Sequence, residues 1–176
     1  MLFRSNLCSF TLQTYKEIYF MAFLTDAQII KAFGQAGNPD NFTIIQLPYP
    51  MRIAWDLKTQ VHKMQCHELA EHRFLSVFND LLTHYGLAEL QRLNIDIFGG
   101  CLNVRLMRGS KTKWSRHSWA IAIDLAPQFN QLKWGANKAL FAKPEYKPMH
   151  DIFYKYGFEN YGLEKGFDFQ HYELVK

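Results

Sequence analysis

The sequence predicts an α+β fold, a single domain with helices packed on a small, mainly antiparallel sheet. The chain has 176 residues, which is enough for one domain with a sizeable core and too few for two. Short apolar runs bounded by Gly, Pro and Asn predict strands, whereas apolar residues spaced three and four apart predict helices. No internal repeat or low-complexity linker divides the chain.

The composition is that of a soluble globular protein, with 48% hydrophobic and 20% charged residues and a formal net charge of +4. Basic residues do not form a stripe interleaved with aromatic ones, which argues against a nucleic-acid partner. No run reaches the roughly 18 apolar residues of a membrane span, so we expect no stable membrane insertion. The three cysteines form neither a paired framework nor a CxxC motif, which predicts reduced thiols in a cytosolic setting. We expect a monomer.

Residues 1–20 carry little helical or strand pattern and no clean signal peptide, so we interpret them as an extension before a domain over 21–176. An N-terminal strand or arm packed on the domain is the alternative. The first helix is predicted over 26–33. Thr25 is its N-cap, Gln28 completes a capping box and Gly34 ends it.

A strand is predicted over 42–47, with Pro48 and Pro50 ending it. The apolar spacing then predicts the main core helix over 57–85, closed by Gly86, and a short second helix over 87–93.

Within the predicted core helix, His67 and His72 resemble a zinc-binding HExxH pair at first sight. They are five residues apart, which separates them by about 140° around a helix, whereas four residues would separate them by about 40°. We therefore interpret both as solvated histidines on a helix rather than as metal ligands.

Further strands are predicted over 101–107 and 120–124, with a basic loop over 108–113 between them. In the second strand the isoleucine face goes to the core, and the alanine face leaves room beside Asp124 for an ion and a substrate. An unbroken strand would put His117 and Asp124 on opposite faces, so a bend at 118–119 is required.

His171 near the C-terminus completes a set of two histidines and one aspartate with His117 and Asp124. Three nitrogen and oxygen ligands with an open fourth position are typical of catalytic zinc, whereas closed structural sites favour cysteine. Asp168 is then free to act as a general base on an attacking water, and Glu173 to orient a ligand imidazole through its other nitrogen. Imidazole and carboxylate ligands also admit other divalent ions.

The pattern Ser115-x-His117-x-x-Ala120-x-Ala122-x-Asp124 resembles the SxHxxGxAxD signature of zinc D-Ala-D-Ala peptidases, which include the vancomycin-resistance enzymes, and of phage L-alanyl-D-glutamate endolysins. An alanine, Ala120, stands where that family has glycine, and its methyl would be costly if the glycine needed a positive φ.

The C-terminal Asp168-x-x-His171 is similar to the family's acid-x-x-His element, and residues 99–110 are similar to the segment with its substrate-binding arginine. The resemblance implies one Zn²⁺ per chain, a D-Ala-D-Ala peptidase or hedgehog-like fold, and a peptidoglycan peptide as substrate. It implies that Arg105, with Arg108 as the alternate, stabilises the oxyanion or holds the substrate carbonyl. Two roles are open for Ser115: a hydrogen bond to the bound peptide or to the local turn.

The predicted function is a zinc metallopeptidase of peptidoglycan stem peptides, of the phage or prophage endolysin type. Such an enzyme accumulates in the cytoplasm and reaches the cell wall after release. Two alternatives are kept, a D-Ala-D-Ala carboxypeptidase or dipeptidase and a non-catalytic, zinc-bearing wall-binding domain.

Overall fold

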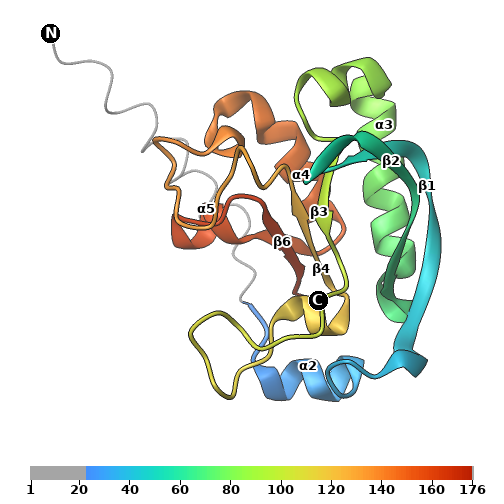
Figure 1. Cartoon of the computed structure of the whole chain (residues 1–176), viewed down its shortest axis with the longest axis vertical. Helices are drawn as coiled ribbons and strands as arrows, with labels where there is room; N and C mark the ends of the chain where they lie inside the picture. The colour runs from blue at the N-terminus through green and yellow to red at the C-terminus, as the bar shows by residue number, and fades with distance from the viewer. Residues whose placement is uncertain (1–22, 176) are drawn as a thin grey trace, which may run out of the picture.

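A six-stranded sheet in the order β2-β1-β3-β4-β6-β5 forms the centre of the protein (Figure 1). The structure is a computed structural model and describes residues 23–175. The strands are β1 (Phe42–Ile53), β2 (Asp56–His67), β3 (Ile97–Gly100), β4 (Ala122–Leu125), β5 (Phe158–Asn160) and β6 (His171–Leu174). Neighbouring strands are antiparallel except β1 and β3, which are parallel. The α+β class and the mainly antiparallel sheet are therefore confirmed.

The α-helices of the described residues are α2 (Asp26–Phe33), α3 (Glu71–Arg92), α4 (Lys147–Lys155) and α5 (Tyr161–Lys165). Helix α2 confirms the predicted capping box, since Thr25 and Gln28 hydrogen-bond reciprocally and Gly34 ends the helix at φ 76°. None of the helices in residues 23–175 is long and apolar enough to cross a membrane. The predicted extension over 1–20 lies outside the described residues.

One face of the sheet is covered by helices α3 and α4, which also contact each other. Tyr172 of β6 stacks on Phe153 of α4 with ring centroids 3.9 Å apart, and Phe158 of β5 packs against Phe74 of α3 at 4.7 Å. Side chains alternate along a strand, so the neighbours of Tyr172, His171 and Glu173, point to the opposite face. The face opposite α4 is thus the one that carries the candidate site.

The helix predicted over 57–85 is wrong in its first half, residues 57–70. Residues 56–67 form strand β2, and α3 begins only at Glu71. Strand β2 is an edge strand whose residues 56–60 are all exposed, so it lacks the apolar alternation of a half-buried strand. The end of the helix was predicted correctly, because Gly86 adopts φ 69° and kinks α3 where the second short helix was expected.

Pro48 and Pro50 do not end strand β1, which continues to Ile53. The pairing with β2 runs from Phe42 to Gln46 and resumes at Met51, so the prolines lie in the irregular stretch between. Proline donates no ladder hydrogen bond, and such a break in register accommodates it.

The strand predicted over 101–107 is also wrong. Strand β3 lies earlier, at Ile97–Gly100, and the following segment forms a loop closed by one bridge between Leu106 and Trp114. His67 is not a solvated helix residue either. It is buried at the end of β2, where its Nε2 lies 2.9 Å from the Phe33 carbonyl oxygen and its Nδ1 accepts from the Leu69 N–H.

Candidate metal centre

A short 3₁₀ turn, Arg116–Trp119, precedes β4 and places His117 beside the strand. The turn ends at Ala120, whose left-handed backbone (φ 53°, ψ 35°) redirects the chain into β4 at Ala122. The predicted bend before Asp124 is therefore present, although the strand starts two residues later than expected. Trp119 anchors the turn from the core, since it is 1% exposed and its indole N–H donates to the Gly34 carbonyl at 2.9 Å.

The register of the β4–β6 pair brings the far end of the chain to the same place. Asp124 lies directly opposite His171, and Ala122 lies opposite Glu173. Residues directly opposite in an antiparallel pair have neighbouring side chains on one face. Strand pairing, rather than proximity in sequence, thus joins the two halves of the site.

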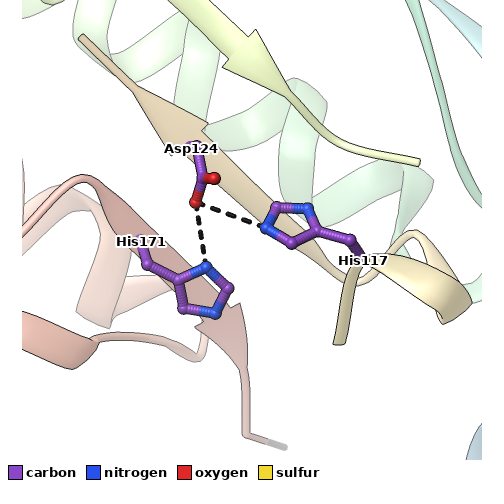
Figure 2. A group of neighbouring side chains, drawn as sticks. All are labelled: His117, Asp124 and His171. Atoms are coloured by element: carbon purple, nitrogen blue, oxygen red, sulfur yellow. Dashed lines mark hydrogen bonds and ion pairs between the residues drawn. The ribbon is translucent and has the colours of Figure 1, made fainter. Parts of the chain in front are cut away.

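Two imidazoles face one carboxylate oxygen at this site (Figure 2). His117 Nε2 lies 3.3 Å from Asp124 Oδ1, and His171 Nδ1 lies 2.9 Å from the same oxygen. The two imidazole ring centroids are 5.0 Å apart. Among the described residues, these three form the group whose ligand atoms, all within 4.8 Å of one another, could hold a metal ion.

The remaining imidazole nitrogens are each held by an oxygen. His117 Nδ1 lies 2.7 Å from the Cys101 carbonyl oxygen, and His171 Nε2 lies 3.1 Å from Glu173 Oε2. An N–H that donates to such an oxygen leaves the opposite nitrogen of the ring free to bind a metal, which is the usual arrangement around metal-binding histidines. The donor set and its supporting hydrogen bonds therefore fit a zinc ion.

Burial and charge act in opposite directions at this site. Burial would raise the pKa of Asp124, but hydrogen bonds to His117 and His171 outweigh it and lower the pKa. Burial would lower the pKa of His171, but Asp124 and Glu173 raise the pKa to about 10. A metal ion bound at Nδ1 would have to displace the proton that these two carboxylates favour on the ring.

Asp168 lies in the loop before β6, with a left-handed backbone at φ 65°. Its Oδ1 accepts a hydrogen bond of 2.8 Å from the Gln170 side-chain amide. Burial raises the pKa of Asp168, although the positive charge of His171 acts against that shift. The Asp168 carboxylate is therefore more basic than that of an ordinary aspartate.

Of the predicted substrate-binding residues, Arg105 and Ser115 lie next to the 116–119 turn, where both hydrogen-bond to Ser118. The guanidinium of Arg105 donates to the Leu106 carbonyl at 3.3 Å, and Arg108 is exposed in the basic loop. Ser115 is buried and its backbone N–H donates to the Arg105 carbonyl at 3.0 Å. Among residues 23–175, the hydrogen bonds of Arg105 go to Leu106, Ser115 and Ser118 and not to His117, Asp124 or His171.

Two contributors to the site were not expected from the sequence. The Cys101 carbonyl that holds His117 is a backbone group, which leaves no trace in the residue type. Arg116, next to His117, forms an ion pair with Glu173. In the sequence, only its position next to the predicted ligand His117 could have drawn attention to Arg116.

The structure is thus an α+β domain in which two histidines and a carboxylate form a group that could hold a metal ion. Residues 108–174 match the family model described as D-alanyl-D-alanine carboxypeptidase. The matched segment covers less than half of the chain but contains His117, Asp124, Asp168 and His171. No curated protein and no solved structure matches the chain.

Proposed function

We propose that the protein is a zinc-dependent peptidase that hydrolyses peptide bonds in peptidoglycan stem peptides. The observation that carries the proposal is the convergence of His117 and His171 on one oxygen of Asp124, with the second nitrogen of each ring held by an oxygen. The match of this segment to the D-alanyl-D-alanine carboxypeptidase family model supports a peptidase.

The chain's residues have separate roles in this proposal. Zinc bound by His117, Asp124 and His171 would supply Lewis acidity toward the scissile carbonyl. Asp168 takes a proton from the attacking water and later gives it to the leaving amine. Arg105, with Arg108 as the alternate, binds the substrate carbonyl as negative charge develops on its oxygen.

Two bonds in the stem peptide are candidate targets. The sequence resemblance to phage endolysins favours an L-Ala-D-Glu endopeptidase, whereas the description of the matched family favours a D-Ala-D-Ala carboxypeptidase. Mass analysis of fragments from purified sacculi distinguishes them, because free alanine marks a carboxypeptidase, whereas stems cut after L-alanine mark an endopeptidase.

For the endolysin assignment, we propose that the protein accumulates in the cytoplasm and reaches the wall only after the membrane is breached. Cell fractionation before and after lysis tests this order. Protein found at the wall of intact cells would contradict it.

The proposed activity is tested by zinc content together with the turbidity of a sacculus suspension. One zinc per chain, with clearing that a chelator stops and added zinc restores, is the expected result. His171→Ala should abolish clearing, whereas the matched control His72→Ala, at an exposed position of α3, should clear as well as the wild type. Sacculi that bind the zinc-loaded protein without clearing would indicate a wall-binding domain instead.

A further inference from the structure

The side chain of Arg116 connects two distant parts of the chain. Its Nη1 lies 2.7 Å from Asp26 Oδ1, and its Nη2 donates to the Leu24 carbonyl at 2.8 Å. Its Nε lies 3.5 Å from Glu173 Oε1. The guanidinium is largely buried, with 16% of the side chain exposed. It therefore joins the start of helix α2 to the strand that carries His171.

Glu173 is a buried carboxylate with two different partners. Its side chain is 5% exposed; Oε1 faces Arg116, and Oε2 lies 3.1 Å from His171 Nε2. The residue opposite it on β5 is Glu159, a second buried acid, and the one opposite on β4 is Ala122. Neither strand neighbour offers Glu173 a positive charge, whereas the Arg116 guanidinium lies against Oε1, the oxygen that does not face His171.

We infer that Arg116 is a positioning residue for the metal ligand His171 and that it acts through Glu173. The inference rests on the proposed zinc site. Arg116 holds one oxygen of Glu173, which keeps the other oxygen against His171 Nε2. That contact fixes the rotation of the imidazole ring and directs Nδ1 toward Asp124, where the zinc would bind.

The geometry also explains why arginine suits this position. A planar guanidinium can contact three groups at once through Nε, Nη1 and Nη2, whereas a lysine ammonium on a flexible stem cannot keep all three contacts. Two of these contacts, to Leu24 and Asp26, lie outside the segment that matches the peptidase family model. Residues beyond the matched segment therefore help to orient a ligand within it.

The test is a double-mutant cycle on zinc affinity, measured on the full chain by competition with a chelating indicator. Arg116→Gln should weaken zinc binding about tenfold, as is typical when a group that orients a metal ligand is lost. Glu173→Gln should weaken it at least as much. The double variant should bind zinc no more weakly than Glu173→Gln alone, because Arg116 would have nothing left to act through.

The control is Arg92→Gln, which removes an exposed arginine from the remote Arg92–Glu89 pair and should leave zinc affinity unchanged. The thermal midpoint of the metal-free variants shows that each is folded. If Arg116→Gln does not fold, Arg116→Lys replaces it in the same cycle. Its predicted loss of about threefold should disappear in combination with Glu173→Gln.

Equal zinc affinity of Arg116→Gln and wild type would overturn the inference while leaving the proposed peptidase intact. Independent, multiplicative losses in the double variant would also overturn it, because they would show that Arg116 does not act through Glu173. A wild-type chain that binds no zinc would overturn the proposed function and this inference together.

Discussion

Replacing Ala120 with glycine tests how much strain the turn before β4 contains. Ala120 has φ 53° and ψ 35° and is fully buried. The left-handed conformation costs an alanine about 1–2 kcal/mol, which glycine avoids. Glycine in turn loses about 0.8 kcal/mol of methyl burial and about 0.4–1 kcal/mol through the greater freedom of its unfolded chain. The gain and the losses nearly cancel, so the free energy of unfolding should change by less than about 1 kcal/mol.

Ala139→Gly supplies the matched comparison. Ala139 is 2% exposed but has an ordinary extended backbone, with φ −65° and ψ 135°. Glycine there suffers the same two losses with no relief of strain, so this variant should lose about 1–2 kcal/mol. Urea denaturation followed by circular dichroism measures both variants. The free energies of unfolding of the two variants should therefore differ by about 1–2 kcal/mol in favour of Ala120→Gly.

An Ala120→Gly variant as unstable as Ala139→Gly would refute this reasoning, because it would show that the left-handed turn costs alanine nothing. The zinc content of Ala120→Gly tests whether the metal site is preserved in this variant. The glycine version should bind one zinc per chain, since its carbonyl can still accept the His67 N–H that Ala120 accepts at 3.0 Å.

Three further predictions concern the base, the acid response and a buried ion pair. Asp168→Asn should retain zinc but lower kcat about 10²- to 10⁴-fold, measured by fragment release from sacculi. Burial lowers the pKa of His150 to about 4, so below its unfolded pKa of 6.5 the unfolded state binds a proton that the folded state excludes. The free energy of unfolding should fall by about 3 kcal/mol from pH 6.5 to 4, as urea titrations at several pH values would show. Arg52→Met should cost about 3–5 kcal/mol, because Asp96 is fully buried and would lose its two guanidinium contacts of 2.6 and 2.7 Å.

Each of these predictions has an outcome that contradicts it. Wild-type turnover in Asp168→Asn would remove Asp168 from catalysis. For His150, wild type and His150→Gln should differ in pH dependence, and identical curves would assign the acid response to other groups. For Arg52, the surface control Arg92→Gln should be near neutral, and an equally small effect of Arg52→Met would mean that Asp96 is solvated in the folded protein.

The sequence predicted that His117, Asp124 and His171 come together because their residue types and spacing suit a metal site, and the structure places the three side chains close enough to hold an ion. His117 and Asp124 flank a short apolar run, and His171 follows an acid by three residues. The structure brings these three side chains together through the bend at Ala120 and the β4–β6 register. The prediction used only the residue types and their spacing, so it did not require the exact position of the bend or the register of the two strands.

The missed features depend on contacts between distant parts of the chain. Arg116 contacts Asp26, 90 residues earlier, and Glu173 near the C-terminus. No local sequence pattern predicts a contact between residues so far apart in the chain. The edge strand β2 was taken for helix because exposure on its outer half removes the alternation that identifies a strand. Helix α2 was predicted to the residue because its capping box and terminal glycine are local signals.

The longer edge strand of the sheet, β2, has a consequence for how the protein behaves at high concentration. Within residues 23–175, strand β2 pairs with β1 on one side only, and an unpaired strand edge is a template on which a second chain can add a strand and begin to aggregate. Lys58 and Lys63 are exposed along this strand. A second copy pairing there would bring like charges together in a setting where they lose water. The two lysines thus protect the sheet against edge-to-edge aggregation, and replacing both with threonine should make the protein prone to precipitate.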